Sequence, residues 1–268
     1  MKRILLSICL VLLAAVSASA EIVTQEIRYN AGEDQLIGFL AYDDGVQEKR
    51  PGILVVHEWW GQNEYVRKRA VMLAELGFTA LAVDMYGDGK VALHPDDAKK
   101  FSSEVGSNLP LARERFTAGL KVLQEHTTVQ ADKIAAIGYC FGGSTVLNMA
   151  RAGVDMRGVV TFHGNLATDA PAQKDTMKAK VLVCHGGDDN FITPEQIEAF
   201  KTEMTNTGVD YTFKTYAGAR HSFTNPQADT YAAQFDLPIA YNEQADHQSW
   251  SDMREFFKNI FADKGQDQ

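Results

Sequence analysis

The sequence has little of what marks the specialised classes of protein. Among 268 residues there are three cysteines, seven prolines and no excess of basic charge, because 26 Lys and Arg stand against 35 Asp and Glu. So few cysteines exclude a disulfide framework, and so few prolines exclude collagen-like and low-complexity chains. The net charge of −9 opposes binding to nucleic acid or to an anionic lipid surface. What remains, with 45% hydrophobic residues, is a globular protein with a large core.

Long hydrophobic runs are also scarce, and the one that stands out lies at the N-terminus. Lys2 and Arg3 precede an apolar run over residues 4–16, and the small residues Ala18-Ser19-Ala20 follow it. The run has about 13 residues where a membrane span needs about 20, so the pattern indicates a secretory signal peptide cleaved after Ala20. We therefore expect residues 21–268 to be the mature protein, in the bacterial periplasm or secreted, without stable membrane association.

After this segment, strand-like and helical patterns alternate along the chain. The segments 22–29 and 36–42 flank a turn and predict an antiparallel hairpin. Short apolar strands then alternate with amphipathic helices, which predicts an α/β fold with a mostly parallel sheet and helices on both faces. The predicted strands are 53–56, 78–83, 133–137, 158–162, 180–184 and 211–216, and the predicted helices are 66–76, 111–123, 144–151, 194–205 and 241–261.

No linker rich in Pro, Ser or Gly divides these elements, so residues 21–268 are predicted to form one domain. Two segments, 85–110 and 224–238, are interpreted as looser chain over the edge of the sheet. In such a sheet, ligands bind at the carboxyl ends of the strands. The residues that follow each strand are therefore the candidates for chemistry.

The strongest chemical motif is Gly138-x-Cys140-x-Gly142, which follows one predicted strand and precedes a helix. This is the setting of the nucleophile elbow, with Cys in place of Ser. Glycines at the flanking positions let strand and helix pass closely while the Cys140 side chain points into the cleft. The backbone N–H of Phe141 would then face a developing oxyanion. The alternative is an inert buried thiol beside a glycine-rich turn.

A nucleophilic cysteine needs a base, and the base needs a group that orients it. Asp189 follows the strand at 180–184, and His221 follows the strand at 211–216. This gives the chain order nucleophile, acid, histidine that the architecture uses. Asp188 is the rival for the orienting role, and its other interpretation is a solvated turn residue.

Three other histidines, His57, His163 and His185, lie at predicted strand ends, and Cys184 is next to the last of them. They could suggest a metal site, but no pair has a recognised ligand spacing, so we predict no metal and assign them to the pocket lining or to loop contacts. A redox pair of Cys140 and Cys184 is a further alternative, although the two lack the spacing of a C-x-x-C motif.

Taken together, the strand-end segments resemble the dienelactone hydrolase family of α/β-hydrolases. The segments are GYCFGG at 138–143, HGGDD at 185–189 and GARHSF at 218–223, with HEWWG upstream at 57–61. The resemblance covers about residues 22–262, nearly the whole of the predicted mature chain. It implies a single-domain α/β-hydrolase fold and the hydrolysis of a small-molecule ester or lactone.

The resemblance also implies roles for individual residues. Cys140 would be the nucleophile, His221 the base and Asp189 its orienting partner, acting without metal or organic cofactor. Glu58 matches a glutamate that contacts the resting thiol in related enzymes and changes partner when substrate binds. A carboxylate beside a thiol disfavours the thiolate, which would keep the nucleophile quiet. Trp59 would supply the second oxyanion N–H by similarity. The alternative for Glu58 is a structural salt bridge.

Two departures from the family pattern bear on the substrate. Members that act on dienelactone hold its carboxylate with arginines, whereas Asp88 and Asn225 stand at the matching positions here, and neither is expected to pair with an anion. Arg220 is an alternative anion clamp that could equally face solvent. The predicted pocket instead gains Trp59, Trp60, Tyr86, Phe141 and His163. We therefore expect a neutral or aromatic-bearing ester or lactone.

One alternative function comes from a different class. Because a fold does not fix a function, the chain could be an exported binding protein that keeps the hydrolase fold and has lost the activity. The two hypotheses differ in one chemical property, the reactivity of the Cys140 thiol.

Overall fold

The computed structural model describes residues 21–262, which form one eight-stranded sheet in the order β1-β2-β4-β3-β5-β6-β7-β8. The signal peptide predicted for residues 1–20 lies outside the described residues. β1 is antiparallel to β2 and β2 to β4, and the other neighbours are parallel. The strands are β1 (Ile22–Ala31), β2 (Asp34–Asp43), β3 (Arg50–Val56), β4 (Thr79–Val83), β5 (Val129–Tyr139), β6 (Gly158–Phe162), β7 (Lys180–Gly186) and β8 (Tyr211–Tyr216). The predicted α/β architecture, a mostly parallel sheet with an N-terminal hairpin, is confirmed.

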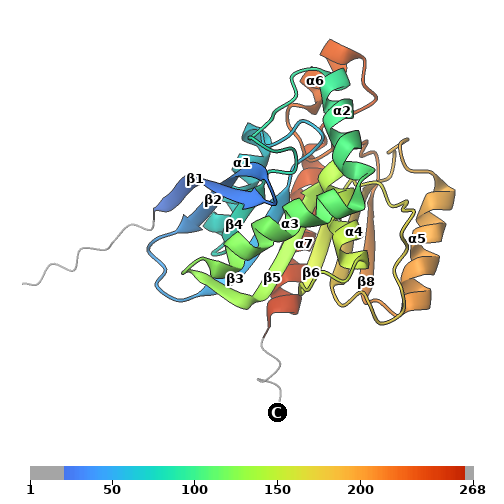
Figure 1. Cartoon of the computed structure of the whole chain (residues 1–268). Helices are drawn as coiled ribbons and strands as arrows, with labels where there is room; N and C mark the ends of the chain where they lie inside the picture. Colours follow the sequence, from blue (N-terminus) through green and yellow to red (C-terminus); the bar gives the residue numbers. More distant parts are fainter. Residues whose placement is uncertain (1–20, 263–268) are drawn as a thin grey trace, which may run out of the picture.

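Helices cover both faces of this sheet (Figure 1). α1 and α7 pack on one face, and α3, α4 and α5 pack on the other. The helices are α1 (Glu64–Glu75), α2 (Pro95–Gly106), α3 (Leu109–Glu125), α4 (Phe141–Arg151), α5 (Pro194–Thr207), α6 (Ala228–Phe235) and α7 (Glu243–Phe261). The central strands β4 and β6 are buried along their whole length, which explains why their sequences are apolar apart from one threonine in each.

The two segments interpreted as loose chain each contain a helix, and this corrects the sequence prediction. In α2 only Ala98 and Val105 are buried, and in α6 only Ala228 is buried. The apolar residues do have helical spacing, with Ala98, Phe101 and Val105 in α2 and Ala228, Tyr231 and Phe235 in α6, but they are few and the helices are short, so the signal in the sequence is weak. Both helices stand at the same end of the molecule, at the top of Figure 1.

Trp60, in the loop after β3, joins α6 to the rest of the fold. Its ring stacks on Tyr231 of α6 with 4.4 Å between ring centroids, and the ring of Phe235 lies 6.1 Å away. Ala98 of α2 belongs to the same buried cluster. Aromatic contacts of this kind add to the burial energy and hold both short helices over the sheet. Within residues 21–262, no helix is both long and apolar enough to cross a bilayer.

Candidate active site

Cys140 occupies a strained turn between β5 and α4. Its backbone has φ 53° and ψ −116°, outside the regions that non-glycine residues favour. A Cβ on Gly138 would collide with the backbone of Gly142, and a Cβ on Gly142 would collide with the carbonyl of Val56. The glycines of the motif are therefore a steric requirement of the turn. The half-buried thiol of Cys140 projects from it into a cavity.

His221 and Asp189 lie in line behind the thiol. Nε2 of His221 is 3.1 Å from Sγ of Cys140, and Nδ1 of the same ring is 2.8 Å from Oδ2 of Asp189. The three residues come from the turn after β5, the loop after β7 and the loop after β8. The parallel strands bring together side chains separated by 81 positions along the sequence.

The structure distinguishes the two adjacent aspartates after β7. Asp189 is buried, and its second carboxylate oxygen accepts a hydrogen bond from the backbone N–H of Phe191 at 2.9 Å. Asp188 is exposed to solvent. The carboxylate of Asp189 is therefore fixed by one hydrogen bond from its own loop and one from the ring of His221, and Asp189 is the residue preferred from the sequence.

The protonation of His221 is governed by its neighbours. Burial lowers the pKa of His221, but Cys140 and Asp189 together raise it by more than burial lowers it. The net result is a pKa of about 10. A ring with this pKa holds a proton at neutral pH, so that an imidazolium stands beside Cys140.

Glu58 does not contact the thiol, contrary to the role that the resemblance implied. Its Oε1 accepts a hydrogen bond from the hydroxyl of Ser222 at 3.0 Å, and its Oε2 accepts one from the amide of Asn225 at 2.6 Å. The alternative of a salt bridge is also wrong, because these two partners are uncharged. Burial raises the pKa of Glu58, and the two hydrogen bonds act in the opposite direction.

The expectation that Asn225 pairs with no anion is therefore corrected, since it binds the carboxylate of Glu58. A neutral amide donates to a carboxylate as readily as a guanidinium does, although with less charge. Asp88 is exposed in the turn after β4, and Arg220 is exposed outside the cavity lining. Neither lies where it could hold a substrate.

The cavity at the thiol has a volume of about 450 Å³. None of the described residues that line it is Lys, Arg, Asp or Glu. Cys140 and His221 are at one wall, and the remaining lining residues are Trp59, Ser102, Ser103, Phe141, Ser144, Asn165, Phe191, Ile192, Ser222, Leu237, Pro238 and Ile239. A mainly apolar cavity with hydroxyl and amide groups suits an uncharged ligand of modest size.

Three residues expected in the pocket lie behind its wall instead. Trp60 is 2% exposed and packs on α6, and Tyr86 is 3% exposed with its hydroxyl donating to the carbonyl of Trp59 at 2.9 Å. His163 is 1% exposed, and its ring bonds the backbone of Cys140. A position at a strand end does not fix the direction of the side chain, so the sequence could not make this distinction.

The sequence analysis missed the part of the cavity that lies under the two short helices. Ser102 and Ser103 come from α2, and Leu237, Pro238 and Ile239 come from the loop after α6. The apolar residues of these segments are few, and no sequence motif marks the residues that line the cavity. Ser144 had a signal, because it directly follows Gly142 and Gly143 of the elbow.

The loop that carries Trp59 is held from two sides. The carbonyl of Glu58 accepts hydrogen bonds from Nδ1 of His57 and from the N–H of Gly61, and Nε2 of His57 accepts from the N–H of Met85 at 3.3 Å. Because C=O and N–H of a trans peptide point in opposite directions, these bonds fix the direction of the Trp59 N–H. The N–H of Phe141 is at the first residue of α4, where helix N–H groups have no partner within the helix.

The two remaining alternatives for the cysteines and histidines gain no support. Among the described residues, no group of three or more His, Cys, Asp or Glu side chains is placed to hold a metal ion. Both described cysteines are free, and Cys184 is buried against the hydroxyl of Tyr216 at 3.5 Å. Burial raises the pKa of Cys184 to about 12, as for an inert thiol.

Comparisons with known proteins identify the family of the chain. Residues 36–261 match the model of the dienelactone hydrolase family. A solved dienelactone hydrolase-like promiscuous phosphotriesterase from metagenomic libraries is 34% identical, with a TM-score of 0.84 over 91% of this chain and 100% of the other. A second solved structure, described as m3DLH, is 36% identical with a TM-score of 0.84 over 90% of this chain and 99% of the other.

Among curated relatives, the protein Usf of Aquifex pyrophilus is 28% identical over 67% of this chain and 79% of its own. The family model covers most of the chain, and the likeness in structure extends over nearly all of it. The chain therefore belongs to the dienelactone hydrolase family, whose members hydrolyse esters and lactones.

Proposed function

We propose that the protein is an exported hydrolase that cleaves a neutral or aromatic-bearing ester or lactone by acyl transfer to Cys140. The observation that carries the proposal is the alignment of the Cys140 thiol, the His221 ring and the Asp189 carboxylate. Nε2 of His221 is 3.1 Å from Sγ of Cys140, and Nδ1 is 2.8 Å from Oδ2 of Asp189. These are hydrogen-bond distances between a nucleophile, its base and the orienting acid.

The first half of the reaction forms a thioester. His221 takes up the proton of the Cys140 thiol, Sγ attacks the carbonyl carbon, and the carbonyl oxygen takes up the electron pair of the broken π bond. When the tetrahedral intermediate collapses, the C–O bond to the leaving alcohol breaks, and the imidazolium of His221 donates its proton to the departing oxygen. Asp189 keeps the ring in the tautomer and orientation that this transfer needs.

The second half releases the acid. The neutral ring of His221 now accepts a proton from water, and the oxygen of that water attacks the thioester carbon. The C–S bond breaks, Cys140 leaves as a thiolate, and the protonated His221 again stands beside it. In both halves the N–H groups of Phe141 and Trp59 would bind the oxyanion.

The chemistry of the cavity supports an uncharged substrate. Its lining provides aromatic and aliphatic surface and the hydroxyls of Ser102, Ser103 and Ser144, but no lysine or arginine for a carboxylate, and the His221 ring is already paired with Asp189 and Cys140. Transferring an anion into such a site without a partner is costly. Esters of aromatic alcohols and neutral lactones fit these conditions, and so does a neutral phosphotriester, the substrate class in the description of one solved relative.

Replacing the nucleophile tests the mechanism. Cys140→Ala is expected to abolish hydrolysis of an aryl ester, and the matched variant Cys184→Ala is expected to retain it. In the wild-type protein, trapping with a slowly deacylating ester followed by mass spectrometry is expected to add one acyl group on the peptide that contains Cys140. Unchanged hydrolysis in Cys140→Ala would refute the mechanism, and absence of both hydrolysis and acylation would favour the non-catalytic binding protein.

A panel of substrates tests the proposed class. Neutral lactones, aryl esters, a neutral phosphotriester and an anionic dienelactone are compared by kcat/KM at one pH. The neutral compounds are expected to be preferred. A strong preference for the anionic dienelactone would contradict the interpretation of the cavity.

Export is tested with the full chain. Cells that express it are separated into cytoplasmic and periplasmic fractions and medium, and the N-terminus of the protein in each is determined. We expect a mature protein that begins at Glu21, outside the cytoplasm. Uncleaved protein confined to the cytoplasm would contradict the proposal.

A further inference from the structure

A buried chain of hydrogen bonds lies behind the thiol, and it begins at the backbone N–H of Cys140. This N–H is shared between the carbonyl of Phe162 at 3.0 Å and Nδ1 of His163 at 3.1 Å. Because Cys140 has a positive φ, its conformation persists only when its surroundings hold it. The ring of His163 is one of the two groups that do so.

The tautomer of His163 follows from these contacts. Nδ1 accepts the N–H of Cys140 and so carries no proton, which leaves the proton on Nε2, where it is donated to Oγ1 of Thr224 at 2.8 Å. The ring must be neutral for this arrangement. Burial lowers the pKa of His163 well below its usual value, and the nearby charges of His221 and Arg69 lower it further.

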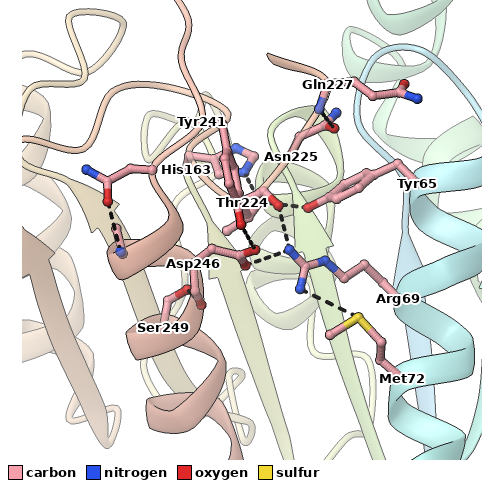
Figure 2. Close-up of polar contacts among 12 residues, drawn as sticks. Tyr65, Arg69, Met72, His163, Thr224, Asn225, Gln227, Tyr241, Asp246 and Ser249 are labelled. Atoms are coloured by element: carbon pink, nitrogen blue, oxygen red, sulfur yellow. Dashed lines mark hydrogen bonds and ion pairs between the residues drawn. The ribbon is translucent and has the colours of Figure 1, made fainter. Parts of the chain in front are cut away.

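Thr224 connects this ring to helix α1. Its hydroxyl lies 2.7 Å from the hydroxyl of Tyr65, and its carbonyl accepts a hydrogen bond from Arg69 at 2.5 Å. Thr224 is three positions after His221 on the same loop and is fully buried. One residue of the histidine loop is therefore bonded both to the ring beneath the nucleophile and to a helix on one face of the sheet (Figure 2).

Arg69 is itself held firmly. Its guanidinium is 2.6 Å from Asp246 of α7, and the rings of Tyr65, Tyr139 and Trp250 lie 5.2 to 5.5 Å from its centre. With 4% of its surface exposed, this cation is almost completely removed from water. A buried charge with one carboxylate partner and three aromatic faces has little freedom to move.

We propose that Arg69, Thr224 and His163 form a positioning chain that sets the distance between the Cys140 thiol and the His221 ring. The chain joins the two loops that carry these groups, and none of its three residues lines the cavity. The inference rests on the proposed function, because it concerns the alignment of that nucleophile and base. Proton transfer depends steeply on such alignment, and a displacement of about 1 Å can cost about 100-fold in rate.

The test removes one hydroxyl. Thr224→Val keeps the volume and the carbonyl that Arg69 binds, but it breaks the contact with His163. We expect kcat to fall about tenfold or more, with KM within about twofold of the wild-type value, because alignment is lost while the cavity is intact. Alkylation of Cys140 by iodoacetamide at neutral pH is expected to slow in the same variant.

Two matched variants separate positioning from simple destabilisation. Thr224→Ser restores the hydroxyl and is expected to recover most of the wild-type kcat. Thr161→Val makes the same chemical change at a buried threonine of β6 whose hydroxyl has no hydrogen-bond partner in the described structure, and it is expected to leave kcat unchanged. If Thr224→Val does not fold, Tyr65→Phe replaces it as the test variant, because it removes the other partner of the Thr224 hydroxyl. The kcat of Tyr65→Phe is expected to fall with KM unchanged.

Wild-type kcat and alkylation rate in folded Thr224→Val, or in Tyr65→Phe, would overturn the positioning chain. An equal loss of kcat in Thr224→Ser would also overturn it. These outcomes are distinct from failure of the proposed function, which is shown by hydrolysis that survives in Cys140→Ala.

Discussion

The side-chain amide of Asn225 donates a hydrogen bond to the carboxyl group of Glu58 at 2.6 Å, across 167 positions of sequence. Ser222 donates to the other oxygen of the same group, so that two residues of the loop after β8 hold one residue of the loop after β3. His221 lies directly before Ser222, which has the unusual φ of 60°. Glu58 therefore acts as a buried tie between the loop of the base and the loop that carries Trp59.

Loss of one donor to this buried carboxyl group should be costly. Asn225→Ala is expected to lower the free energy of unfolding by about 1–3 kcal/mol, because Glu58 then keeps a single hydrogen bond from a side chain. Urea denaturation followed by circular dichroism measures the change.

Asn225 also accepts a hydrogen bond from the N–H of Gln227 at 2.9 Å, so the single variant removes two contacts. A double-mutant cycle with Glu58→Gln isolates the contact between the two side chains. A coupling energy of about 1 kcal/mol is expected for a bond to a buried carboxyl group. Additive effects of the two substitutions would contradict the tie.

The raised pKa of Glu58 predicts a specific dependence of stability on pH. Burial raises the pKa above the ordinary value of 4.5, so between 4.5 and the folded-state value the folded protein binds a proton that the unfolded chain has lost. The free energy of unfolding therefore falls as the pH rises through this window. Glu58→Gln removes the group and should flatten the fall. Parallel pH profiles for the two proteins would contradict the assignment.

Asp189 is expected to be essential for catalysis, whereas the adjacent Asp188 is not. Asp189→Asn is expected to lower kcat by about 10³- to 10⁴-fold, as for loss of the acid in related triads, because the ring of His221 loses the partner that fixes its tautomer. Asp188→Asn is the matched control, and it should retain wild-type kcat since that side chain is exposed.

Replacement of Asp189 should also shift the dependence of activity on pH. His221 donates a proton during acyl transfer, and with a pKa of about 10 it loses this proton as the pH rises through that value. Activity of the wild-type protein should therefore decline at about pH 10, and in Asp189→Asn the decline should begin at lower pH. An unchanged descending limb in Asp189→Asn would show that the carboxylate does not support the charged ring.

The sequence predicted the sheet well because its strands are buried on both faces and its glycines are sterically constrained. β6, predicted at 158–162, has those bounds in the structure, since all five of its residues are apolar or small and buried. α2 and α6 were missed for the opposite reason, as they bury almost none of their side chains. A pattern method detects a helix only through the face that it buries.

The site was predictable where a role depends on chain position and not where it depends on side-chain direction. Cys140, His221 and Asp189 follow three strands, and parallel strands bring their ends together. His163 also follows a strand, but its ring turns beneath the nucleophile instead of into the cavity. Glu58 was expected at the thiol, and its actual partners lie on another loop. Only the packing of the loops decides such contacts.

The elbow glycines provide a test of steric necessity. Gly138→Ala is expected to prevent folding or to cost more than about 4 kcal/mol, because the new Cβ would collide with the backbone of Gly142. Gly77→Ala is the matched control, since no atom lies within 4 Å of its new Cβ and only the positive φ of 88° is penalised. That strain costs about 1–2 kcal/mol. Equal losses in thermal denaturation would contradict the steric argument.

A new charge at the cavity wall should change substrate preference. Ser103 is an exposed residue of α2 that lines the cavity, so Ser103→Arg places a cation there without disturbing the core. A partly exposed ion pair contributes about 0.2–1 kcal/mol, which predicts a rise of up to about fivefold in kcat/KM for an ester that bears a carboxylate, relative to its neutral counterpart. Ser103→Gln, which adds length without charge, should not alter the ratio. Because salt screens exposed charges, the gain should shrink in about 1 M NaCl. A ratio unchanged in Ser103→Arg at low salt would mean that substrates do not pass near α2, and it would place the bound acyl group on the other side of the cavity, toward Phe191.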